Sequence, residues 1–213
     1  MEAGMSEGIF GLAGVVLGLL FQWVQQAWTQ RRERAANARY LAIRVVCALD
    51  KYIEDCLAVT FDDGYSEGRP AGKDGYAEAQ VTTPVAPIFP SDADWKSINH
   101  ELMYRLLALP RDVEIADHAI DAAGEHDTPP DYCDFFEERQ YQYAKLGLSA
   151  FDITKDIRRI YAIPPLPAAQ WSAADRLAEQ LKKIEDGRRE YGERQKQLWA
   201  EFPPPPAPGA LGS

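Results

Sequence analysis

The feature that most constrains this chain is an apolar run near its N-terminus, "GIFGLAGVVLGLLFQWVQQAWTQRRER", Gly8 to Arg34. A helix needs about 20 mainly apolar residues to cross the hydrocarbon core of a bilayer, and the run reaches that length at Trp28. Trp23 and Trp28 lie where an interfacial aromatic belt is expected. The pattern predicts one membrane-spanning helix, and we assign residues 1–30 to a transmembrane anchor.

The flanks of this run predict its orientation. The residues before it contain no Lys or Arg, whereas a juxtamembrane basic collar follows it, made of Arg31, Arg32, Arg34, Arg39 and Arg44. By the positive-inside rule, the N-terminus faces outward and the C-terminal part is cytoplasmic. Three cysteines without a CxxC pair, Cys47, Cys56 and Cys133, agree with a reducing compartment.

Two other interpretations of the run stay open. A cleaved export signal is disfavoured, because the start is acidic and the residues after the run are bulky. A buried helix in a soluble oligomer is the stronger competitor, since a run of this length also suits a core. If the run is a span, its glycines offer a self-association face with small-xxx-small spacing: Gly4, Gly8, Gly11, Gly14 and Gly18.

Composition is that of a globular protein, with 46% hydrophobic and 26% charged residues. The net charge of -10 and the pI near 4.8 argue against a nucleic-acid partner. Charge is also segregated: residues 1–49 hold five basic and three acidic side chains, whereas residues 50–139 hold 21 acidic and seven basic ones. The chain therefore combines a basic collar with an acidic middle.

The predicted fold is all-α: a single N-terminal transmembrane helix continues into a cytoplasmic helical bundle of about four to five helices, with short coiled-coil-like packing. No Gly or Pro occurs between Val24 and Thr60, so one long helix is expected there. We assign residues 31–202 to the bundle. Residues 203–213, "PPPPAPGALGS" after Phe202, are expected to form a flexible tail.

Between the helices, residues 61–90 are rich in Gly and Pro and predict a long loop or a strap laid over the core. We expect three apolar residues of this segment to pack on the bundle: Val85, Ile88 and Phe89. Ser91 with Asp94 resembles a capping box that begins a helix ending before Pro110.

The remaining sequence predicts three more helices. A short one follows Pro110, a long one begins at Thr128, and a last one runs from Ser172 to about Phe202. The last helix carries an imperfect coiled-coil seam with steps of four and three residues: Leu177, Leu181, Ile184, Tyr191 and Leu198. This seam is expected to pack on the long first helix or on a partner.

Catalytic and metal motifs are not found. The chain has no GxxxxGK[ST], GxGxxG or GxSxG sequence, and His100 with Glu101 lacks the second histidine of a zinc-protease motif. One helical face combines carboxylates and an imidazole, Glu114, Asp117, His118 and Asp121, but the paired Glu-x-x-His motifs of di-iron bundles are missing. We interpret it, and the acidic run "EHDTPPDYCDFFEE", as solvated surface, and expect no enzyme activity, catalytic residue, cofactor or metal.

The resulting hypothesis is a non-enzymatic scaffold or adaptor at the membrane, which presents an acidic cytoplasmic bundle to a protein partner or self-associates into a homo-oligomer. Its expected partners are the lipid bilayer and a protein that the sequence does not identify. One alternative is a membrane-acting effector, toxin- or defence-like, whose spans oligomerise. Another is a soluble helical oligomer in which the N-terminal helix is core.

Overall fold

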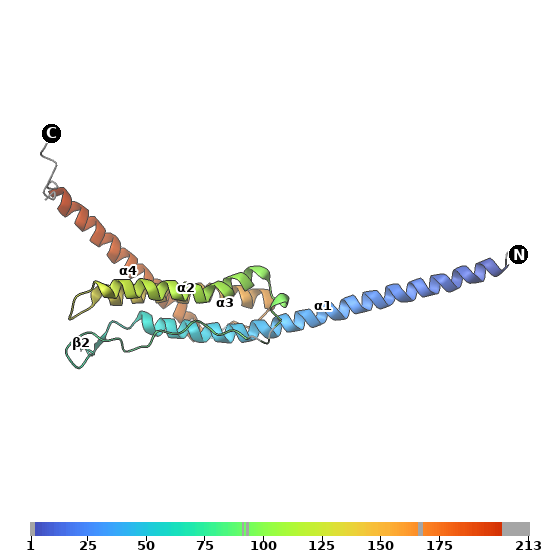
Figure 1. The fold of residues 1–213 in the computed structure, drawn as a ribbon, viewed down its shortest axis with the longest axis horizontal. Coiled ribbons are helices and arrows are strands. Elements are labelled where there is room, and N and C mark those ends of the chain that lie inside the picture. The colour runs from blue at the N-terminus through green and yellow to red at the C-terminus, as the bar shows by residue number, and fades with distance from the viewer. Residues whose placement is uncertain (1–2, 91, 93, 166–167, 202–213) are drawn as a thin grey trace, which may run out of the picture.

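The protein is described by a computed structural model that gives the backbone of residues 3–90, 92, 94–165 and 168–201, and the side chains of residues 21–90, 92, 94–165 and 173–201. Across these residues the chain forms four α-helices (Figure 1): α1 (Ala3–Thr60), α2 (His100–Glu125), α3 (Cys133–Tyr161) and α4 (Ala168–Glu201). The predicted all-α class is confirmed.

The first helix is continuous, as predicted. At 1.5 Å per residue, the 58 residues of α1 span about 87 Å. Only its second part lies in the bundle, because Ala38 is the first buried residue among the described side chains of α1. Figure 1 shows the blue N-terminal part of α1 extending away from the bundle at one end, and the end of α4 leaving it at the other.

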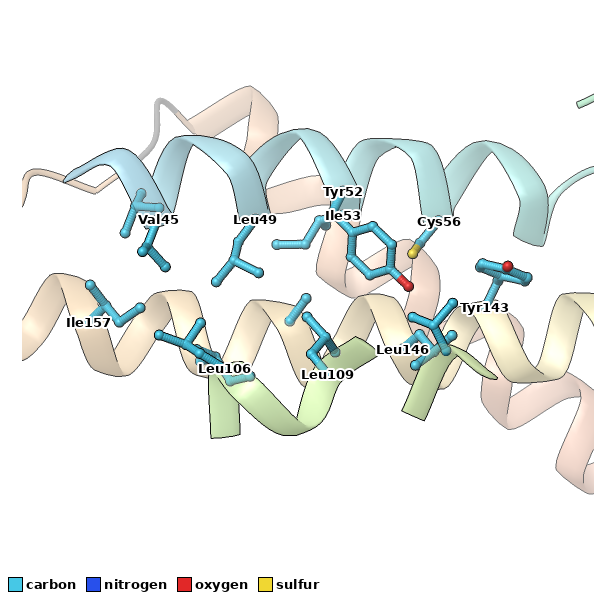
Figure 2. Close-up of a cluster of buried hydrophobic side chains, with 14 of the residues drawn as sticks. Val45, Leu49, Tyr52, Ile53, Cys56, Leu106, Leu109, Tyr143, Leu146 and Ile157 are labelled. Atoms are coloured by element: carbon cyan, nitrogen blue, oxygen red, sulfur yellow. The ribbon is translucent and has the colours of Figure 1, made fainter. Parts of the chain in front are cut away.

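The core is built around α3, which packs against α1, α2 and α4. Figure 2 shows Leu49 and Cys56 of α1 facing side chains of α2 and α3. Helical spacing of apolar residues predicts a core face on this part of α1, and six of its seven positions are buried: Leu41, Val45, Leu49, Tyr52, Ile53 and Cys56. The seventh, Leu57, is partly buried against the core. Gly147 permits close approach of the helices, since an added Cβ would lie 2.8 Å from Leu177 Cδ1 and 3.1 Å from Cys56 Cβ.

Helix α2 differs from its prediction at both ends. Asp94 caps only the 3-10 turn η1 (Trp95–Ser97), by accepting from the Lys96 N–H, and α2 begins at His100 with Asn99 as its N-cap. The helix also continues through Pro110, where two helices were predicted. An interior proline costs about 3 kcal/mol, but the helix buries an apolar face on both sides of it: Leu102, Leu106, Leu109, Val113, Ala116 and Ile120.

Helix α3 begins later than predicted, at Cys133. Asp127 explains the shift, because its carboxylate accepts from the Thr128 and Phe135 N–H groups at 2.8 Å each and so ties the loop to the first turn. Helix α4 begins at Ala168, before the predicted Ser172. The seam of α4 is packed only in its first half: Leu177 and Ile184 are buried, whereas Tyr191 and Leu198 are exposed.

The segment between α1 and α2 holds a small antiparallel hairpin, β1 (Tyr65–Ser66) with β2 (Arg69–Pro70). Beyond it the chain runs extended along the bundle, and Phe89 packs against the core and against the Trp95 ring. The predicted packing of Val85 and Ile88 is wrong, since both side chains are largely exposed. Val81 and Ala86 of the same segment are instead partly buried against the core.

The predicted span is helical in backbone from Gly8 to Trp28. The side chains of residues 8–20, and with them the glycine face from Gly4 to Gly18, lie outside the described residues, as do residues 203–213. Among the helices of the described part of the chain, none has a stretch with the length and apolar character needed to cross a membrane.

Candidate interaction surfaces

The projecting arm, residues 21–37 of α1, exposes almost every side chain it has. Its apolar and aromatic residues are among the most exposed of the described chain: Phe21 73%, Trp23 71%, Val24 60% and Trp28 58%. Arg32 lies over the Trp28 ring, with 3.7 Å from its Cζ to the ring centroid. The arm therefore combines uncovered apolar surface with arginines, as the sequence pattern suggested.

The apolar positions of the arm continue the buried seam of α1. Within the bundle that seam follows alternating steps of four and three residues: Ala38, Ala42, Val45, Leu49, Tyr52, Cys56 and Val59. The same steps lead back through Ala35 and Arg31 to three apolar residues of the arm: Trp28, Val24 and Phe21. The seam thus runs beyond α3, its partner in the bundle, and is uncovered on the arm.

The collar arginines divide into two groups. Arg31, Arg32 and Arg34 lie on the arm and are exposed. Arg39 and Arg44 lie where α1 enters the bundle and also make structural contacts. Arg39 Nη2 donates to the Ala162 carbonyl at 3.5 Å, just past α3, and Arg44 Nη1 pairs with Asp92 at 3.1 Å.

The C-terminal end of α3 brings further basic residues to the collar. Arg158 pairs with Asp50 of α1 at 2.7 Å. Asp156 is shared between Arg105 of α2 at 2.7 Å and Arg159 at 2.8 Å, and these arginines lower the pKa of its carboxyl group. Sequence reasoning did not place α3 here, because the contact joins residues more than 100 positions apart.

The opposite end of the bundle is acidic. A pocket of about 340 Å³ opens between the start of the strap, α3 and α4, and three carboxylates line it: Asp63, Asp131 and Glu137. The Tyr65 hydroxyl donates to Asp131 Oδ1 at 2.6 Å, which raises the pKa of Tyr65 to about 12. Burial and the carboxylates Asp131 and Asp127 raise the pKa of the Cys133 thiol. This thiol is held protonated, which is the opposite of an activated nucleophile.

A buried ion pair fastens the strap to α3 near this pocket. Asp62 and Arg139 have side chains only 2% exposed, with 3.0 Å between Asp62 Oδ2 and Arg139 Nη1. The Asp62 carboxylate also accepts from the N–H groups of Gly64, Gln80 and Val81, and Arg139 donates to the Val81 carbonyl. Both carboxylate oxygens of Asp62 and both terminal nitrogens of Arg139 therefore have hydrogen-bond partners, which a buried pair requires.

Sequence reasoning missed this pair, although a signal was present. Arg139 lies three residues after Phe136 and four before Tyr143, on the apolar face of α3. An ionised side chain at a core position requires a partner. The "FDDG" stretch that follows the first helix supplies that partner, Asp62.

The carboxylate and imidazole group of α2 is not assembled into a site. Asp117 accepts from the Tyr143 hydroxyl at 2.9 Å, while Glu114, His118 and Asp121 are exposed. Among the described residues, no group of His, Cys, Asp and Glu side chains is arranged to hold a metal ion. His100 and Glu101 lie exposed in the first turn of α2.

The last helix packs on the bundle through Leu177 and Ile184, is held again at Arg188, and then leaves the bundle. Arg188 donates to Glu137 at 2.8 Å and to Glu138 at 2.7 Å, and it lies 4.3 Å from the centroid of the Tyr141 ring. Beyond Arg188 the helix exposes three large apolar residues: Tyr191 59%, Leu198 55% and Trp199 66%. The molecule is thus a helical bundle with a helical projection at each end, one basic and aromatic and one mixed in charge.

Comparison with models of protein families, with curated proteins and with solved structures finds no match to this chain.

Proposed function

We propose that this protein is a non-enzymatic, membrane-anchored helical scaffold or adaptor. The observation that carries the proposal is the division of α1, which is core in the bundle from Ala38 onward and uncovered, aromatic and arginine-rich before it. Insertion into a bilayer would remove these exposed apolar side chains from water. Trp and Arg are the residues expected at the boundary between the bilayer and water. In this proposal the N-terminus faces outward and the bundle is cytoplasmic.

The continuity of α1 sets the geometry of the proposal. Ten residues separate Trp28 from Ala38, about 15 Å of helix. The part of α1 in the bundle adds about 33 Å from Ala38 to Thr60. The acidic pocket lies near Thr60, so it would stand about 50 Å from Trp28 at the membrane boundary. The helix between them contains no Gly or Pro after Val24. Such an arrangement suits presentation of a surface to a protein partner.

The acidic end supplies the surface for that partner. Asp63, Asp131 and Glu137 converge on the pocket, and their charge is offset in part by Lys183 in the lining and by Arg188, the partner of Glu137. A basic partner protein fits this balance, because charge complementarity favours its encounter with such a surface.

The proposal is tested by fractionation of cells that express the full chain or a chain without residues 1–30. We expect the full chain to resist carbonate extraction and to be released by detergent, and the shortened chain to be soluble. Orientation follows from cysteine labelling, since Cys47 and Cys133 are exposed and Cys56 is buried. A membrane-impermeant maleimide should label the two exposed thiols only after the cells are opened. Labelling of these thiols in intact cells would mean that the bundle faces outward, opposite to the proposed orientation.

A soluble oligomer is the second candidate, and the uncovered seam favours it. Phe21, Val24 and Trp28 continue the heptad steps of the buried part of α1, and such a seam can pair with another helix in water. If both chains are soluble, and only the full chain is oligomeric by light scattering, the arm is an assembly helix and the anchor is wrong. Depolarisation of cells on overexpression would instead support a membrane-acting effector.

A further inference from the structure

The end of the bundle nearest the arm carries more basic side chains than the collar alone. Arg39 of α1 donates to the Ala162 carbonyl, and Arg158 of α3 pairs with Asp50 of α1, so the last turns of α3 lie beside the collar. These turns carry two further exposed cations, Lys155 and Arg159. We call the resulting set the basal basic surface: Arg31, Arg34, Arg39, Lys155 and Arg159.

The basal basic surface is not neutralised by its neighbours. The nearby carboxylates of Asp50, Asp92 and Asp156 are each held in an ion pair with an arginine. Asp156 is shared by two arginines, which leaves one positive charge in excess, and Arg159 keeps a side chain that is 75% exposed. Glu33, Asp152 and Glu101, the last in the first turn of α2 beside Tyr161, are further exposed carboxylates of this region, fewer than its cations.

We infer that the basal basic surface docks on the headgroups of anionic phospholipids, so that α3 as well as α1 contacts the membrane surface. The inference rests on the proposed anchor. Arg31 and Arg34 follow Trp28 within two turns. Arg39, which meets Ala162 just past α3, stands about 17 Å along the helix from Trp28, and Arg159 and Lys155 lie about 5 and 11 Å further away than Ala162. Long basic side chains reach several ångströms toward the bilayer, and its surface potential extends over a Debye length of about 8 Å.

The fold also explains why this end, rather than the other, faces the lipid. The opposite end gathers the carboxylates of the acidic pocket, which an anionic surface repels. Attraction at the base and repulsion at the far end act in the same direction, so both hold the bundle upright. A flexible linker would lose this effect, but α1 has no Gly or Pro between Val24 and Thr60.

The test uses the full chain in vesicles of phosphatidylcholine with about 20% phosphatidylserine. A donor dye is placed on Cys47, an exposed residue near the base, in a Cys133→Ser background. An acceptor dye is carried on the acyl chain of either lipid at equal density. If anionic lipids gather at the base, energy transfer to labelled phosphatidylserine should exceed transfer to labelled phosphatidylcholine about twofold, and 1 M salt should abolish the excess.

The decisive variant is Lys155→Glu with Arg159→Glu, which changes α3 and leaves the collar intact. Each basic residue near an anionic leaflet changes the local binding constant about fivefold, so the excess transfer should fall by at least half. The matched control is Arg69→Glu with Lys73→Glu, the same charge change on exposed residues of the far hairpin, which should leave the excess unaltered.

The outcomes separate the inference from the proposed function. A chain that floats with the vesicles but shows no phosphatidylserine excess, or an excess that the α3 variant leaves intact, overturns the inference while the anchor stands. A chain that does not float with the vesicles overturns the anchor and the inference with it. Concentration-dependent oligomers of the full chain that disappear in the α3 variant would assign the surface to a second copy instead.

Discussion

At the scale of single residues, the best-defined feature is the Asp62 and Arg139 pair. Each partner is buried, so neither regains water if the other is lost. Burial alone would raise the pKa of the Asp62 carboxyl group, but hydrogen bonds from Val81 and Gly64, together with Arg139, lower it below its usual value. The pair therefore stabilises the fold most at neutral pH.

The first prediction concerns removal of one partner. Arg139→Met leaves the Asp62 carboxylate buried without its cation, and we expect the free energy of unfolding to fall by about 3–5 kcal/mol. Urea denaturation of the full chain measures the loss. Arg189→Met is the control, because its pair with Asp186 is exposed and is expected to contribute less than about 1 kcal/mol. Equal effects of the two substitutions would contradict a buried, obligatory pair.

The second prediction is a pH dependence with a defined sign. Because the native pKa of Asp62 is lowered, its contribution is fully present above the unfolded value of about 3.9 and is lost as the pH falls through the native value. The full chain should lose stability below about pH 4, and Asp62→Asn should flatten part of that acid limb. Urea midpoints between pH 2 and 7 test this, and an unchanged acid limb in the variant would argue against it.

At the scale of helices, packing overrides local preference in both directions. Pro110 would end a helix by its own chemistry, yet α2 continues because residues on both sides share one buried face. The seam of α4 would form a coiled coil by its spacing, yet only its first half, Leu177, Leu181 and Ile184, packs on the bundle. Whether a helix follows the preference of its local sequence depends on the residues that pack against it.

Two Gly→Ala substitutions should change the stability of the protein in opposite directions, depending on whether the site is packed. Ala is favoured over Gly in a helix by about 1 kcal/mol, so Gly187→Ala, where an added Cβ meets nothing within 4 Å, should stabilise the protein by up to that amount. Gly147→Ala should destabilise it by about 1–3 kcal/mol, because the Cβ enters the contact with Leu177 and Cys56. Thermal unfolding measures both, and a stabilising Gly147→Ala would mean that the helices separate at low cost.

At the scale of the whole molecule, the chain is a packed bundle with helical projections whose stability should differ from that of the core. Residues 21–37 of α1 make few tertiary contacts, whereas Ala38 to Thr60 form much of the core. Helices without tertiary packing are marginal in water. The same continuous helix should therefore contain a labile part and a stable part.

Hydrogen exchange of the full chain tests this division. In detergent-free buffer the amides of residues 21–37 should exchange much faster than those of residues 42–56, which approach the protection of global unfolding. In lipid vesicles, protection should appear around Trp23 and Trp28 and leave the bundle unchanged. Equal protection of the arm in both conditions would point to assembly through the arm rather than to insertion.

The sequence by itself determined the helical class, the continuity of α1 and the core face from Leu41 to Cys56, since these depend on spacing and on missing Gly and Pro. Only the tertiary structure decided that Asp62 pairs with Arg139, 77 residues away, that α2 passes through Pro110, and that the end of α3 joins the collar. These features depend on contacts between distant segments, whose free energies outweigh local preferences of about 1–3 kcal/mol. For the same reason, the collar could be predicted as a set of arginines on one helix, but the basal basic surface could not.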